Sequence, residues 1–141
     1  MKEVQQSKHR PPLKRINGKN TCFTDSIAFL LGQDPKDTPF FIGYKNFIVE
    51  TKKYFTKRGY KIKPREYKPY MLSDENELYL VQGLSRRSKV KASASFAKRR
   101  QGINHCVVYL GKKPIMGGKL KGTPLFVWQI TPPIKVSNDK I

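Results

Sequence analysis

Apolar side chains near the start of the chain recur with the period of an amphipathic helix. Phe23, Ile27 and Leu30 occupy positions i, i+4 and i+7 of one segment, which is the spacing of a single helical face. Thr21 is a candidate N-cap ahead of this segment, and Gly32 directly after it is a residue type that commonly ends helices. The pattern therefore predicts a helix that begins at about Thr21 and ends before Gly32.

A second helix is predicted after a segment of turns. Asp34-Pro35 and Thr38-Pro39 follow the first helix, and the residue before a proline disfavours helical backbone. The residues that then recur three and four apart are Tyr44, Phe47, Ile48, Thr51, Tyr54 and Phe55. Gly59 is a candidate C-cap, so we expect this helix to run from about Tyr44 to just before Gly59.

The second half of the chain has the pattern of strands. YKIKP (60–64) alternates apolar and basic residues, and three longer apolar segments are ELYLVQG (77–83), HCVVYLG (105–111) and PLFVWQI (124–130); such short runs near Gly and Pro are typical of strands. The segment SRRSKVKASASFAKRRQG (85–102) has no clear period. Because helices come first and strands later, the order predicts an α+β fold with an antiparallel sheet.

Length and composition bound the domain organisation. A chain of 141 residues is one domain by length. We expect a basic flexible arm over 1–15, a single domain over 16–135 with a basic insertion at 85–102, and a tail over 136–141. No apolar run approaches the ~18 residues of a membrane span. Two cysteines do not make a disulfide framework, so a reducing, cytoplasmic location is expected.

Net charge is the strongest feature of the composition. Lys and Arg number 29 against 10 Asp and Glu, which gives a net charge of +19. Such a charge is either a solvated lysine-rich surface or a binding surface for a polyanion such as nucleic acid or an acidic protein. The densest cations lie in the basic insertion and are Arg86, Arg87, Lys89, Lys91, Lys98, Arg99 and Arg100.

Cys22 and His105 are the residues that offer covalent chemistry. Cys22 lies at the predicted start of the first helix, where the helix dipole and free N–H groups favour a thiolate. His105 opens a predicted strand and is a candidate base for that thiol. Alternatively, Cys22 is an unreactive residue of the core, and His105 is a histidine at a sheet edge without a catalytic role. His9 lies in the arm and is expected to be solvated.

Three segments resemble the papain-like cysteine peptidase superfamily. They are NTCFTDSIAFLLGQDPKDTPFF (20–41), YLVQGLS (79–85) and NHCVVYLGKKP (104–114). The likeness is greatest to small members related to bacteriocin-processing peptidases, which are often phage and bacterial proteins. The resemblance implies a papain-like fold in which Cys22 is the nucleophile on a helix and His105 is the base on the sheet.

The resemblance leaves two roles open. It implies that an Asn or Gln shortly before the cysteine helps form the oxyanion hole, and Asn17 and Asn20 are the candidates. It also implies an Asp or Asn on the strand after His105, where this chain has neither before Gln129. Either Gln129 substitutes, or the pair works without an orienting carboxylate, or the site is inactive.

Two neighbouring residues bear on this pair. Asp25 lies one turn after Cys22 and either opposes the thiolate or stabilises the first turn of the helix. Cys106 follows His105 in a strand, so we expect its side chain on the opposite face, in the core. No regular spacing then supplies four converging ligands, and neither a metal nor a cofactor is expected.

The sequence therefore predicts a thiol hydrolase that cleaves an amide, isopeptide or similar acyl bond of a protein or peptide. The alternative is an inactive papain-like binding module that holds nucleic acid or an acidic protein through its basic surface. A small phage- or virus-encoded inhibitor of a host protein is a third possibility, and its location would be the host cytoplasm or the virion.

Overall fold

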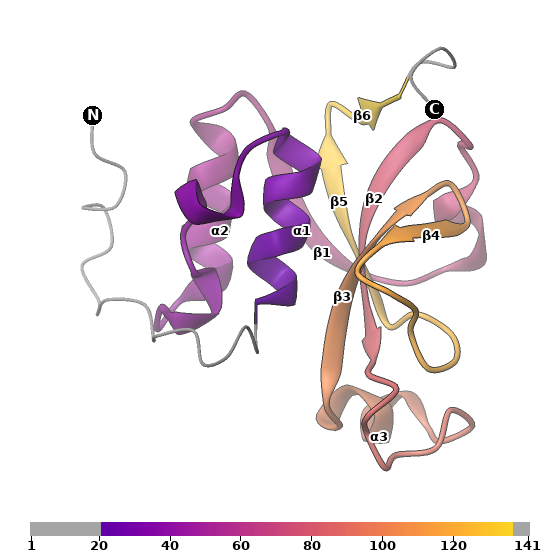
Figure 1. The fold of residues 1–141 in the computed structure, drawn as a ribbon. Helices are drawn as coiled ribbons and strands as arrows, with labels where there is room; N and C mark the ends of the chain where they lie inside the picture. The colour runs from indigo at the N-terminus through magenta and orange to yellow at the C-terminus, as the bar shows by residue number, and fades with distance from the viewer. Residues whose placement is uncertain (1–20, 137–141) are drawn as a thin grey trace.

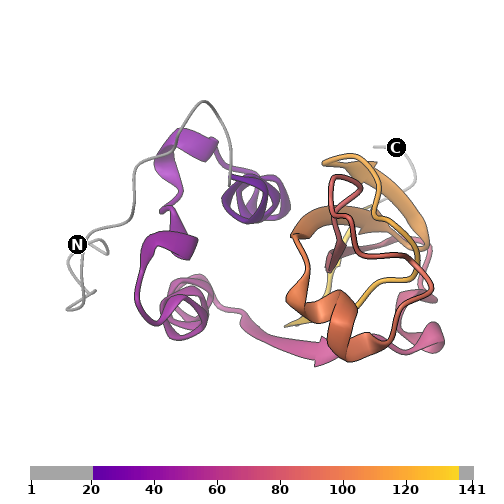
Figure 2. The same cartoon turned by 90° about the horizontal axis from the view of Figure 1, so that it is seen from below.

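A computed structural model describes residues 21–136 and shows two helices packed against a twisted sheet (Figures 1 and 2). The α-helices are α1 (Cys22–Leu31), α2 (Phe47–Thr56) and α3 (Phe96–Gln101), and the 3₁₀ helices are η2 (Pro35–Asp37), η3 (Phe41–Gly43) and η4 (Pro69–Leu72). The strands are β1 (Lys61–Glu66), β2 (Glu77–Leu84), β3 (Asn104–Leu110), β4 (Lys113–Met116), β5 (Phe126–Thr131) and β6 (Ile134–Lys135).

Within these residues the strands form one antiparallel sheet. Its order is β1-β5-β2-β3-β4, and β6 pairs with β2. The strand β3 lies between β2 and the short strand β4, which pairs only with the second half of β3, from Val108 onward. The fold is therefore α+β with a helix packed on an open antiparallel sheet, as the order of the elements predicted.

The first predicted helix is confirmed. Gly32 ends α1 with φ of 67°, a left-handed conformation that glycine adopts at little cost. Thr21 is at the N-cap position, but its hydroxyl donates to the carboxylate of Asp25 over 2.8 Å, and no side-chain cap bond forms there. The predicted capping role of the Thr21 side chain is wrong because Asp25 competes for its hydroxyl.

The second helix is shorter than predicted. It begins at Phe47 because the chain first forms η3 over Phe41–Gly43 and then extends at Tyr44, with φ of −83° and ψ of 147°. Tyr44 is nevertheless buried in the core with α2. The apolar spacing therefore predicted correctly that Tyr44 is buried and wrongly that its backbone is helical.

The four predicted strands are confirmed as β1, β2, β3 and β5, while β4 and β6 were not predicted. Both are short, and the four residues of β4, KPIM, do not form a clear apolar run. The basic insertion contains the six-residue helix α3, although it shows no period. Ser95 caps α3 by accepting from the N–H of Lys98 over 3.2 Å, so capping defines this helix more than an apolar face does.

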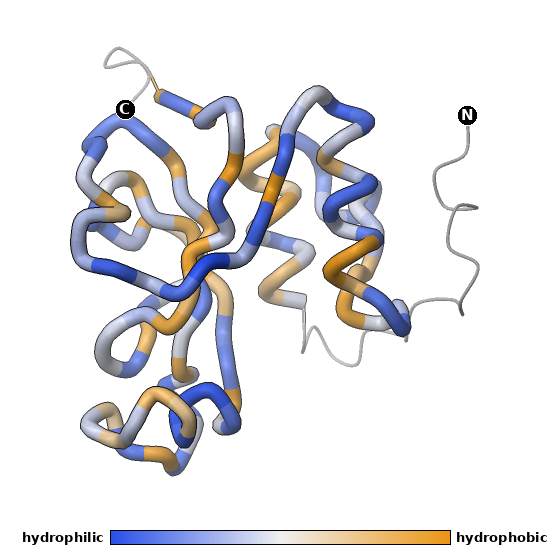
Figure 3. Tube along the Cα trace, turned by 180° about the vertical axis from the view of Figure 1, so that it is seen from behind, coloured by the Kyte–Doolittle hydropathy of each residue, from blue (hydrophilic) through white to orange (hydrophobic). Residues whose placement is uncertain are grey.

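The main core lies between the sheet and the helices α1 and α2. Phe23 of α1 is buried, and its ring centroid lies 5.0 Å from that of Trp128 on β5. A second cluster on the other sheet face includes Val107 and Val127. The edge strand β1 is mostly hydrophilic (Figure 3), and Ile62 is its one buried residue. No helix of residues 21–136 has the length and apolar character of a membrane span.

Candidate active site

Cys22 and His105 lie in one cleft between α1 and β3. Cys22 is the first residue of α1, which packs on β3, and His105 is the second residue of β3. The cleft has a volume of about 640 Å³. Its lining includes Thr21, Cys22, Asp25, Ser26, Arg86, Arg87, Asn104, His105, Cys106, Gly117 and Lys119. The structure therefore brings together the two residues that the sequence paired across 83 positions.

The Cys22 thiol has the electrostatics of a thiolate. Its pKa is lowered to about 4 from an ordinary value of 9.0. The largest cause is a hydrogen bond from the Cys106 thiol, and the His105 ring and the backbone of Cys106 also lower it, against the opposing effect of burial. A thiolate is the nucleophilic form of cysteine, so Cys22 is ionised across the neutral pH range.

The His105 ring is oriented by a backbone carbonyl. Its Nε2 lies 2.6 Å from the carbonyl oxygen of Gly117. Because a carbonyl only accepts, Nε2 carries the proton, and Nδ1 is the ring nitrogen that can exchange a proton with a thiol. The pKa of His105 is raised, first by the bond to Cys22 and then by Gly117, while burial and Arg87 oppose this rise.

Gly117 follows β4 and has the conformation that this contact requires. Its φ is 97°, and a Cβ there would lie 3.2 Å from the carbonyl oxygen of Cys106 and 3.3 Å from Cα of Val107. A side chain there would carry backbone strain and would crowd these two atoms. No role was predicted for this residue from the sequence, although the Gly117-Gly118 pair was a signal for an unusual backbone turn.

Cys106 lines the cleft with Cys22 and His105, although strand alternation predicted its side chain in the core, away from this pair. It is buried at 7% exposure in the helix-facing core, as predicted, but the Cys22 side of α1 covers that same face. The interaction between the two thiols, together with burial, raises the pKa of Cys106 well above its ordinary value. Cys106 stays a protonated donor, and Cys22 is the thiolate.

A chain of side-chain hydrogen bonds holds the start of β3. The Trp128 indole donates to Gln82 over 3.1 Å, and the Gln82 amide donates to Asn104 over 3.0 Å. Asn104 then donates to the carbonyl of Gly102 over 2.9 Å. These bonds hold Asn104, which directly precedes His105 in β3. This role was not predictable from the sequence because the three side chains lie on three separate strands.

Asp25 lines the cleft but is engaged locally. Its carboxylate accepts from Thr21, and its backbone N–H donates to the Thr21 carbonyl over 2.8 Å. This arrangement is that of a carboxylate in the first helical turn, where it interacts favourably with the helix dipole.

Other predicted site residues lie apart from this pair or outside the described chain. Asn17 and Asn20, the oxyanion candidates, fall outside residues 21–136. Gln129 is exposed and lines a different cleft with Arg65 and Tyr70, so the structure does not bring it to His105. The Gly117 carbonyl occupies the ring nitrogen that an orienting side chain would bind.

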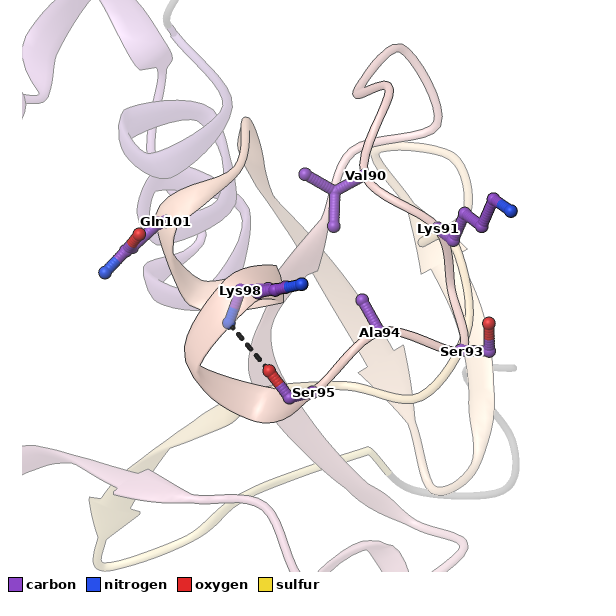
Figure 4. A pocket seen from close by; sticks show the side chains of 7 residues that line it. All are labelled: Val90, Lys91, Ser93, Ala94, Ser95, Lys98 and Gln101. Carbon is purple, nitrogen blue, oxygen red and sulfur yellow. Dashed lines mark hydrogen bonds between the residues drawn. The ribbon is translucent and has the colours of Figure 1, made fainter.

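The basic insertion divides into two parts. Arg86 and Arg87 line the Cys22 cleft, whereas Lys91 and Lys98 line a separate groove of about 690 Å³ beside α3. Figure 4 shows Val90 and Ala94 facing the inside of this groove, and Lys91 pointing away from it. Lys89 and Arg100 are exposed.

Arg99 has a structural role within the insertion. Its guanidinium donates to the carbonyls of Ala94 and Thr123, each over 3.1 Å. These bonds tie α3 to the loop before β5. Arg99 is therefore less available to a polyanion than its neighbours on α3.

No group of three or more His, Cys, Asp or Glu within residues 21–136 has an arrangement that would hold a metal ion.

Comparison with known proteins adds no identification, because no protein-family model, no curated protein and no solved structure matches this chain.

Proposed function

We propose that this protein is a thiol hydrolase of papain-like type, with Cys22 as nucleophile and His105 as general acid and base. The observation that carries the proposal is geometric: Cys22 at the start of α1 shares one cleft with His105, whose Nε2 is held by the Gly117 carbonyl. The lowered pKa of Cys22 supports it. The helix that bears the nucleophile packs on the sheet that bears the base, which supports the papain-like assignment.

The reaction has two steps. Cys22 Sγ attacks the carbonyl carbon of the acyl bond, and Nδ1 of His105 passes a proton to the leaving amine as the bond breaks. Water then attacks the resulting thioester while His105 accepts its proton, which releases the acid and regenerates the thiolate. The first N–H groups of α1 lack helical partners and are the candidate donors to the oxyanion.

Acyl-enzyme formation tests this proposal without knowledge of the natural substrate. A p-nitrophenyl acetate reaction should give a burst of product and an acetyl group on Cys22, detected by peptide mass spectrometry. Cys22→Ala should lose the burst, and His105→Ala should slow both acylation and turnover by a factor of about 10² or more. Acetylation confined to lysines, with no difference between wild type and Cys22→Ala, would contradict the proposal.

The groove beside α3 favours a second candidate, a binding module for a polyanion. Its lining includes Lys91 and Lys98, and the exposed Arg100 follows on the same helix. Binding that is unchanged in Cys22→Ala, combined with the absence of any acyl-enzyme, would favour this candidate over the hydrolase.

A further inference from the structure

We propose that the cleft around Cys22 selects acidic peptides, in which a carboxylate lies next to the acyl bond that is cleaved. This inference rests on the proposed thiol hydrolase and names its class of substrate. It depends on the charges that line the cleft and on the residue types missing from that lining.

Three cations surround the reactive pair. Arg86 and Arg87 follow β2, and Lys119 follows the Gly117-Gly118 turn, so two separate segments of the chain contribute them. All three side chains are exposed, and none forms an ion pair or a side-chain hydrogen bond with another residue of 21–136. Arg87 lies close enough to His105 to oppose its protonation. These cations are available to a ligand.

The negative charge that lines the cleft is smaller. Asp25 is the one acidic residue in the lining, and its carboxylate accepts a hydrogen bond from Thr21. The other acidic residues between 21 and 136 lie on other elements and are Asp34, Asp37, Glu50, Glu66, Asp74, Glu75 and Glu77. The cleft lining is thus net positive even after Asp25 and the Cys22 thiolate are counted, and a concave site concentrates this field.

The cleft also contains a buried donor. The hydroxyl of Ser26 is 1% exposed as a residue, lines the cleft and has no hydrogen-bond partner among residues 21–136. Buried hydroxyl groups normally find a partner. A carboxylate or carbonyl oxygen of a peptide that enters deeply enough to reach this hydroxyl would accept a hydrogen bond from it.

The lining favours a peptide over nucleic acid. It contains no Phe, Tyr or Trp side chain, and sequence-tolerant binding of single strands relies on large aromatic groups that stack on bases. The reactive pair attacks an acyl carbon, which the phosphate backbone does not offer. The separate groove, which suits a longer polyanion, is lined by Lys98 of α3 and by Lys91.

Two alkylating reagents that differ in charge test the inference at Cys22. Iodoacetate is anionic and iodoacetamide is neutral, and both form a thioether with loss of iodide. We expect the ratio of their rate constants at Cys22, relative to a small neutral thiol, to favour iodoacetate by about threefold to tenfold at low salt and to fall as salt rises. Arg86→Gln with Arg87→Gln should remove most of that preference.

The matched control is Lys61→Gln with Lys63→Gln, which removes the same charge from the exposed side of the edge strand β1. This pair should leave the ratio unchanged. Fast reaction with iodoacetamide but no preference for iodoacetate would overturn the inference and leave the proposed hydrolase standing. Failure of both reagents to label Cys22 faster than the neutral thiol would overturn the proposed function as well.

Peptide probes distinguish an acidic peptide from nucleic acid as the ligand of the cleft. A peptidyl chloromethyl ketone with Glu beside the reactive group should label Cys22 about threefold or more faster than the Gln probe, because only Glu interacts with the free cations. Oligothymidylate should not protect Cys22 from either probe at concentrations where an acidic peptide does. Protection by oligothymidylate alone would overturn the acidic-peptide assignment.

Discussion

Two groups of cations in the same basic insertion have different surroundings. Arg86 and Arg87 lie beside a thiolate and a histidine, in a cleft that the start of α1 closes on one side. Lys98 and Arg100 lie on α3, which Figure 1 shows far from α1 and α2. In the sequence both groups belong to one basic segment and were predicted to form one binding surface. A continuous run of charge in sequence thus divides between a candidate reaction site and a candidate binding surface.

The division follows from the backbone between the two groups. The N–H of Ser85 donates to the carbonyl of Ile103 over 2.7 Å, so the loop that contains α3 leaves and rejoins the sheet at one place. Arg86 and Arg87 stay at that junction, next to the start of β3. Residues further along the loop are carried away from the cleft.

The largest expected effect in the cleft comes from Cys106. Cys106→Ala removes the hydrogen-bond donor that contributes most to the low pKa of Cys22, so this pKa should rise toward its ordinary value. The labelling rate of Cys22 by iodoacetamide at about pH 5 should fall tenfold or more, since each unit of pKa costs tenfold in thiolate there. Cys106→Ser keeps a donor and should retain most of the rate. Equal rates for Ala and Ser would contradict the role of this hydrogen bond.

Two neighbouring glycines test the orientation of His105. Gly117→Ala places a Cβ against Cys106 and Val107, whereas a Cβ at Gly118 would have no atom within 4 Å. Both have positive φ, so both substitutions carry a similar backbone strain of about 1 kcal/mol. Gly117→Ala should lower acylation of Cys22 roughly tenfold, and Gly118→Ala should lower stability alone. Equal acylation by the two variants, at temperatures where both are folded, would exclude the Gly117 carbonyl as the orienting group.

Nucleic-acid binding should depend more on the cations of α3 than on those of the Cys22 cleft. Lys98→Gln with Arg100→Gln should reduce the salt slope of binding to a DNA duplex by up to about two, because each substituted cation neutralises about one phosphate. Arg86→Gln with Arg87→Gln should change that slope less. The reverse order, measured by fluorescence anisotropy across a salt series, would place any polyanion surface at the cleft instead.

The smallest effect is expected at Gln129. Because its side chain is exposed and lines a separate cleft, Gln129→Ala should leave the rate of Cys22 acylation within about twofold and stability within ~0.5 kcal/mol. A large loss of acylation with unchanged stability would show that Gln129 reaches the site during the reaction.

Much of the fold was predictable because it depends on local pattern. The apolar period around Phe23 and Ile27 predicted α1, and the short apolar segments near Gly and Pro predicted β2, β3 and β5. The start of α2 was misplaced because Tyr44 is buried without being helical. Burial alone produces the same apolar spacing as a helix over so short a segment.

The candidate site was predictable only where one residue type carries the chemistry. Cys22 at a helix start and His105 at a strand start have local signals. The Gly117 carbonyl has none, because any residue supplies a carbonyl and its position depends on the turn after β4. Cys106 was excluded by strand alternation, which was right about its face and did not reveal that α1 covers it.

The pH dependence of Cys22 alkylation shows whether Cys22 is an activated nucleophile. With a pKa of about 4, the thiol loses reactivity only as pH falls through that value, so iodoacetamide labelling should rise with a midpoint near there and stay flat from about pH 6 to pH 8. Peptide mass spectrometry should show Cys22 modified long before Cys106, whose pKa is raised by burial and by Cys22. A rate that keeps increasing up to about pH 9, or equal and slow labelling of both cysteines, would contradict the account of Cys22 as an activated nucleophile.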